Sequence, residues 1–201
     1  MKLSRLLFPS FFLLGCNTTP PPAKIVEIDN RPFEEQSLIR KFQLADSLYD
    51  EFETNEIKKT ETYEKQKTSL IKFITDSLHD EAKQWHAIVH EISVKHWPAD
   101  FIEVTLLIPK GIMPDKDEKY PEYSSIVLSS GIPLNEKSSV KNSLRELSKG
   151  DNVLVSGSFQ KSEAGDIDFA AYTDVLSHDG DIFTNPKLEF DIKNIVKQNH
   201  K

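Results

Sequence analysis

Cysteine, glycine and positive charge are scarce in this chain. Of its 201 residues only Cys16 is a cysteine, which excludes an intramolecular disulfide. The seven glycines leave few loops that could wrap a phosphate, and neither a Gly-x-Ser-x-Gly nucleophile motif nor a Walker-type loop occurs. The net charge of -7 disfavours nucleic acid as a partner, because Lys and Arg supply most of the affinity for a phosphate backbone. These absences predict a non-catalytic protein with no cofactor.

Long apolar runs are also missing, so a membrane-spanning helix is not expected. The apolar residues nearest the start lie within 6–14, after Lys2 and Arg5 and before Gly15. A basic start, a short apolar core and a small residue at its end are typical of a secretory signal peptide. The sequence therefore predicts export.

The end of this apolar stretch carries the single cysteine. The residues Leu13-Leu14-Gly15-Cys16 resemble the lipobox of bacterial lipoproteins. The resemblance implies cleavage after residue 15, so that residues 1–15 are the signal peptide, and lipidation of Cys16. Acyl chains hold a protein at a membrane because each buried CH2 contributes about 0.8 kcal/mol. The alternative is an ordinary signal peptide that happens to contain a cysteine.

Asn17 bears on the location of the anchored protein. In enterobacterial lipoproteins an Asp at this position favours retention in the inner membrane, so Asn17 resembles the outer-membrane class. The resemblance implies a membrane-anchored lipoprotein of the bacterial cell envelope, facing the periplasm if the cell has two membranes. Residues 16–31, with prolines at 20–22, are expected to form an extended tether.

Residues 32–82 have the pattern of a helical segment. Asn30 is a candidate cap, Pro32 suits a first turn, and Glu34 and Glu35 complement the helix dipole. Two apolar stripes at helical spacing are separated by a polar stretch near residues 53–67. The segment is either one helix of about 75 Å at 1.5 Å per residue or two helices, with Thr54 or Asn55 as the second cap. We favour two helices packed on each other or on the following domain, although a partner chain could also cover the stripes. The stripes comprise Leu38, Phe42, Ala45, Tyr49 and Phe52, then Leu70, Phe73, Ile74 and Leu78.

Period-two alternation begins at Trp85 and predicts strands in residues 83–201. A change of phase at Glu91 indicates a bulge in the first strand. A helix is expected to start at Ser138-Ser139 and to end at Gly150. Residues 160–186 are the least regular part, with a short strand expected at 169–172. The five main strands are predicted at 85–94, 101–108, 126–129, 152–159 and 187–196.

Five strands with a helix between the third and fourth follow the order of an OB-fold, a small Greek-key barrel. Three phrases, WHAIV from residue 85, LRELSKGDNV from 144 and VSGSF from 155, resemble OB-fold domains of the tRNA anticodon-binding-like kind. Gly150 suits a turn and Gly157 would relieve crowding where the sheet bends. The expected class is α+β, an N-terminal helical segment followed by a five-stranded OB-fold-like β-barrel. Another small barrel or an α+β sandwich is the alternative fold.

Two sets of side chains could bind a metal. His86 and His90 are four residues apart, but they fall on an expected strand, where solvent-facing histidines are the simpler interpretation. Asp166, Asp168, Asp179 and Asp181 could offer oxygen ligands, yet their spacing matches no calcium loop. The sequence therefore predicts no metal site.

Several aromatic residues could form a platform for sugar rings or bases, although packing is the simpler interpretation. They are Trp97, Phe101, Tyr120 and Tyr123.

Together these features predict an exported, lipid-anchored protein with a non-catalytic OB-fold interaction module. Its expected partners are the membrane, through the lipid, and an envelope protein or glycan. There are two alternatives. One is a metal-dependent enzyme that uses His86, His90 or the acidic loop with Asp166, Asp168, Asp179 and Asp181. The other is a module that binds oligonucleotides or oligosaccharides.

Overall fold

The computed structural model describes residues 29–52, 54–96, 99–111, 125–135, 138–162, 165, 167, 169–171 and 181–198. It has the predicted α+β class, with helices first and a closed sheet after them. Residues 1–28, which include the signal peptide, Cys16 and most of the tether, lie outside the described part.

The helical segment consists of two helices that pack against each other as a hairpin. They are α1 (Phe33–Asp50) and α2 (Glu56–Lys72). Asn55 caps α2 by accepting a hydrogen bond from the backbone N–H of Lys58 at 3.1 Å, as expected. The expected cap at Asn30 is wrong, because Pro32 occupies the N-cap position of α1.

The second helix ends in a π-helical turn, η1 (Phe73–Ser77). The N–H of Leu78 bonds to the carbonyl of Phe73 at 3.2 Å, and the N–H of Asp80 bonds to the carbonyl of Ile74 at 3.0 Å. These wide turns bring the chain into the first strand within a few residues.

Among the described residues, five strands form a closed sheet and a sixth, short strand lies at one side. Antiparallel pairs join β1 to β2, β2 to β3, β1 to β4 and β4 to β6. The parallel pairing of Val127–Ser129 with residues 187–189 closes the circuit between β3 and β6. The short β5 (Phe169–Ala171) pairs with β6. The five strands are β1 (Glu81–Lys95), β2 (Phe101–Pro109), β3 (Ser125–Pro133), β4 (Asn152–Phe159) and β6 (Pro186–Lys197).

The strand predictions agree closely with this sheet, but their boundaries differ. The first strand starts at Glu81, four residues before the prediction, and the third extends to Pro133. The bulge predicted near Glu91 is confirmed by a register shift between Val89 and Glu91. Two further register shifts were not predicted: one in β1 between Ala82 and Trp85, and one in β6 opposite Ser156 and Gly157.

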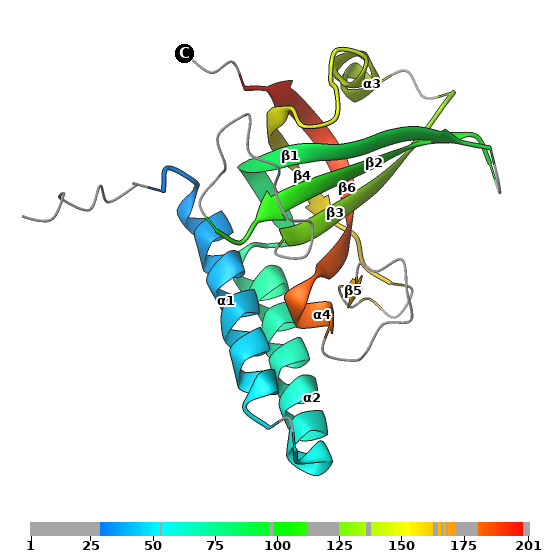
Figure 1. Cartoon of the computed structure of the whole chain (residues 1–201). Coiled ribbons are helices and arrows are strands. Elements are labelled where there is room, and N and C mark those ends of the chain that lie inside the picture. Colours follow the sequence, from blue (N-terminus) through cyan, green and yellow to red (C-terminus); the bar gives the residue numbers. More distant parts are fainter. Residues whose placement is uncertain are drawn as a thin grey trace, which may run out of the picture.

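Helices cover both ends of the closed sheet. In Figure 1 the short helix α3 (Ser139–Leu144) lies at one end, and the α1–α2 hairpin lies at the other. Helix α3 is shorter than predicted, because it ends at Leu144 and not at Gly150, although Ser138 caps its start. A one-turn helix, α4 (Asp181–Thr184), packs near α1.

The turn between α3 and β4 is built as its sequence predicts. Gly150 has a φ of +88°, a conformation that glycine adopts without a Cβ clash. Its N–H bonds to the carbonyl of Val89 at 2.8 Å. The carboxylate of Asp151 accepts hydrogen bonds from the N–H of Ser148 at 2.8 Å and from Lys197 at 2.7 Å. This stretch is therefore a structural corner that fastens α3 to β1 and β6.

One hydrophobic cluster includes buried side chains from the helices and from the interior of the sheet. Trp85, Phe159 and Phe190 form a chain of aromatic contacts inside it, with ring centroids 5.6 and 5.3 Å apart. Burial of such side chains contributes about 1.5–3 kcal/mol each. The helical segment and the sheet therefore stabilise each other.

Gly157 allows β4 and β6 to approach where the aromatic chain packs. A Cβ at this position would come within 2.7 Å of a ring carbon of Phe190 and closer still to the carbonyl oxygen of Asp191. We expect Gly157→Ala to lower the free energy of unfolding by about 3 kcal/mol, the upper part of the range for overpacking. Urea denaturation measures this change.

Gly131→Ala is the matched control, because its new Cβ would meet only the Phe101 ring at an ordinary 3.5 Å. A loss no larger for Gly157→Ala than for Gly131→Ala would show that the two strands can separate freely at this point.

Candidate functional site

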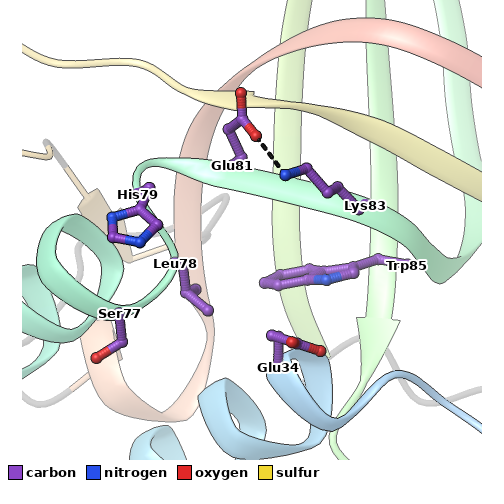
Figure 2. A pocket seen from close by; sticks show the side chains of 7 residues that line it. All are labelled: Glu34, Ser77, Leu78, His79, Glu81, Lys83 and Trp85. Carbon is purple, nitrogen blue, oxygen red and sulfur yellow. Dashed lines mark ion pairs between the residues drawn. The ribbon is translucent and has the colours of Figure 1, made fainter.

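A hollow of about 210 Å³ lies where the helical hairpin meets the first half of β1. Figure 2 shows Ser77 and His79 on one side, Glu34 and Trp85 on the other, and Leu78 between them. The hollow thus has an apolar base and a polar rim. Its lining residues are Glu34, Ser77, Leu78, His79, Glu81, Lys83 and Trp85.

The backbone beside the hollow holds three residues in the left-handed region. His79, Asp80 and Gln84 have φ values of 54°, 60° and 55°. This conformation costs a non-glycine residue about 1–2 kcal/mol. Residues far along the chain contact two of these three positions. Lys161 forms an ion pair with Asp80 at 2.6 Å, and the N–H of Gln84 donates to the Ser156 hydroxyl at 2.9 Å. The bends turn the chain from η1 into β1 around the hollow.

The rim of the hollow carries a pair of oppositely charged side chains. Glu81 and Lys83 form an ion pair at 2.8 Å (Figure 2). The hydrogen bond between them lowers the pKa of Glu81 and raises the pKa of Lys83, so both are charged at neutral pH. Trp85 is only 1% exposed and packs against Phe159. Its ring is therefore a wall of the core and offers no open face on which a sugar or base could stack.

A partly buried cluster of ionisable side chains, here called the Glu35 cluster, lies beside the hollow. It consists of Asp29, Arg31, Glu35 and His86. The N–H of His86 donates to Glu35 Oε2 at 2.8 Å, while Glu35 Oε1 has no hydrogen-bond partner among the described residues. Arg31 donates to Asp29 at 2.6–3.1 Å and to the carbonyl of Pro109 at 2.6 Å.

Burial sets the protonation of this cluster. It raises the pKa of Glu35 to about 8 and lowers the pKa of His86. The Asp29 carboxylate, in contrast, accepts hydrogen bonds from Arg31 that hold its pKa below the ordinary range. At neutral pH the cluster therefore contains an ionised Asp29–Arg31 pair, a neutral Glu35 and a neutral His86.

The two histidines that were considered as alternative metal ligands have separate surroundings. His86 belongs to the Glu35 cluster, and His90 is the extra residue at the register shift of β1. In the described part of the chain, no group of three or more His, Cys, Asp or Glu side chains is placed to hold a metal ion.

Most of the other candidates fall outside the described residues. Phe101, from the proposed aromatic platform, is partly exposed and lies against Gly131. Asp181 begins α4. The remaining candidates, Trp97, Tyr120, Tyr123, Asp166, Asp168 and Asp179, lie outside the described part.

The outer face of β1, β2 and β3 carries an apolar strip that the sequence did not reveal. Ile88, Leu107 and Val127 are neighbours in register. Strand alternation points them away from the interior, and they do not belong to the main cluster. They are nonetheless only 8%, 3% and 0% exposed. The strip is therefore not an exposed apolar surface of the sheet.

Sequence reasoning also missed the burial of Glu35, which was interpreted as a dipole-complementing acid. Glu35 precedes Leu38 and Ile39 by three and four residues, so it shares their helix face. That spacing was the available signal. Only the sheet, however, shows that this face is covered at residue 35.

Comparison with known proteins adds no family to this description. The chain matches no family model, no curated protein and no solved structure. None of the described helices has the length and apolar character needed to cross a membrane.

Lys110 is a further buried charged residue, 9% exposed, and burial lowers its pKa to about 8. Such a lysine can be a reactive amine. Here its Nζ donates to the carbonyls of Phe183, at 2.5 Å, and Thr184, which are the last residues of α4. Lys110 therefore caps this helix and ties it to the end of β2.

We expect Lys110→Met to lower the free energy of unfolding by about 1–3 kcal/mol, because two carbonyls lose a charged donor. Chemical denaturation at pH 7 measures the loss, and the exposed Lys193→Met is the control, with an expected change within about 0.5 kcal/mol. Equal effects of the two substitutions would contradict a structural role for the Lys110 ammonium.

Proposed function

We propose that this chain is an exported, lipid-anchored lipoprotein of the bacterial cell envelope whose closed sheet is a non-catalytic interaction module. The observation that carries the proposal is the sequence Leu13-Leu14-Gly15-Cys16 at the end of a short apolar stretch. The proline-rich residues that follow suit a spacer between a lipid anchor and a folded part. Asn17 makes the outer membrane the expected site if the cell has two membranes.

We further propose that the closed sheet is an OB-fold-type barrel. Its support is the strand circuit β1–β2–β3–β6–β4–β1, with parallel β3 and β6 and with α3 between β3 and β4 in the chain. A five-stranded Greek-key barrel with one intervening helix is expected to have such a circuit. The expectation of a non-catalytic role rests on the sequence, which has no nucleophile elbow and no phosphate-binding loop.

The exposed positions of the sheet are where an envelope protein or glycan would bind. Val94 on β1 and Val196 on β6 are each 51% exposed. Apolar side chains at such positions provide contact area for a partner. The helical hairpin also exposes apolar residues, among them Leu44 at 57%, so the two parts of the molecule can be compared directly.

The anchoring proposal predicts that Cys16→Ala abolishes incorporation of labelled fatty acid and moves the protein out of the membrane fraction. The reason is that the thiol is the acyl attachment point. Radiolabelling and fractionation of cells measure both effects. Asn17→Asp is the control, since it changes the neighbouring position and should keep the label. A Cys16→Ala protein that remains in the membrane fraction would overturn the proposed anchor.

The module proposal predicts where a partner contacts the chain. A photo-crosslinking amino acid at Val94 or Val196 should give a discrete adduct in intact cells, and one at Leu44 should not. Gel electrophoresis followed by mass spectrometry identifies the adduct. The similar exposure of the three positions makes Leu44 a matched control. Adducts at Leu44 alone would contradict this prediction and would show that the partner binds the helical hairpin.

A further inference from the structure

The Glu35 cluster joins the start of α1 to the closed sheet. Glu35 accepts the N–H of His86 on β1 at 2.8 Å, and Arg31 donates to the carbonyl of Pro109 on β2 at 2.6 Å. Both contacts are buried or partly buried. Any change of charge in this cluster therefore acts directly on the junction between the hairpin and the sheet.

The cluster contains two carboxylates and one guanidinium. The Asp29 carboxylate accepts three hydrogen bonds of 2.6–3.1 Å from the Arg31 guanidinium. Glu35 Oε1 lies 3.8 Å from Arg31 Nε, and the Glu35 side chain is 0% exposed. Because Asp29 already neutralises Arg31, an ionised Glu35 would be a buried charge with little compensation, which is costly.

We propose that Glu35 is a protonation-controlled clasp: neutral Glu35 holds the start of α1 on the closed sheet, and its ionisation weakens that junction. The proposal stands on the position of the carboxyl group between α1 and β1 and on the excess of carboxylates over guanidinium. It does not depend on lipid anchoring or on any partner of the sheet.

The direction of the pH dependence follows from linkage. The pKa of Glu35 is raised to about 8 by burial in the docked state, and an exposed glutamate titrates near 4.3. The contribution of Glu35 to docking is therefore complete below about pH 4.3. Between that pH and about 8, the docking equilibrium constant falls up to tenfold for each pH unit. Above pH 8 it falls no further.

The groups that face Glu35 do not reverse this dependence above pH 6.5. From the segment before α1 these are the Arg31 guanidinium and the Asp29 carboxylate, whose pKa the hydrogen bond from Arg31 holds below its ordinary range, and from β1 it is His86. Burial lowers the pKa of His86 below its ordinary 6.5, so this imidazole gains its proton only at lower pH. From β2 the cluster receives the Pro109 carbonyl, which does not titrate.

The test uses the purified full chain between pH 6.5 and 9. Hydrogen exchange, corrected for the intrinsic dependence of exchange on pH, reports the opening of the first turns of α1 and of the His86 amide. We expect wild-type protection to fall up to tenfold per pH unit toward pH 8 and then to level off. Glu35→Gln, which keeps an acceptor for His86, should show constant protection. Glu34→Gln, the exposed neighbour on the same turn, should behave as wild type.

A direct titration keeps the proposal falsifiable if a variant folds poorly. The side-chain carbon of Glu35, followed by NMR in the wild-type chain, should titrate near pH 8, and Asp29→Asn should move its midpoint downward by freeing Arg31. A Glu35 midpoint near 4.3, or the same loss of protection with pH in Glu35→Gln and wild type, would overturn the proposal.

Discussion

Closure of the sheet depends on a short parallel contact between β3 and β6. The three residue pairs from Val127–Ser129 to residues 187–189 are the link that an open sheet with the same antiparallel neighbours would lack. Their formation pairs backbone groups that would otherwise remain at two free edges. It also creates an enclosed interior, and the packing of the molecule follows from the need to fill and cover that interior.

The interior is filled by the aromatic chain of Trp85, Phe159 and Phe190, and its two ends are covered by helices (Figure 1). The α1–α2 hairpin belongs to the same folded unit as the sheet, because its buried residues are part of the same cluster. This coupling also explains the strained residues near the hollow. The chain must leave α2 and enter β1 within a few residues, and the left-handed His79 and Asp80 make that change of direction.

Where the helices meet the sheet, ionisable groups are buried, and each has different partners. Arg31 is neutralised by Asp29, and Lys110 binds two carbonyls at the end of α4. The Glu35 carboxyl group accepts one backbone hydrogen bond, from the N–H of His86, and its other oxygen has no hydrogen-bond partner among the described residues. It is therefore buried without a cation that would fully neutralise its ionised form. Such groups add little net stability compared with apolar packing, but they make the junction depend on protonation. The candidate site is thus a boundary between two parts of the molecule, with the small polar hollow beside it.

The amino-acid sequence by itself determined what depends on near neighbours. Period-two alternation identified β4, Thr54 and Asn55 were the two candidate caps of a second helix, and Gly150 marked the turn into β4, because each signal lies within a few residues of its effect. Only the tertiary structure decided the closing contact, the identity of Phe190 and Asp191 as the groups that crowd Gly157, and the burial of Glu35. The buried Glu35 carboxyl group accepts a hydrogen bond from the N–H of His86, which lies 51 residues further along the chain. Local patterns state which face of an element is apolar, whereas burial and charge compensation depend on which distant element packs against that face.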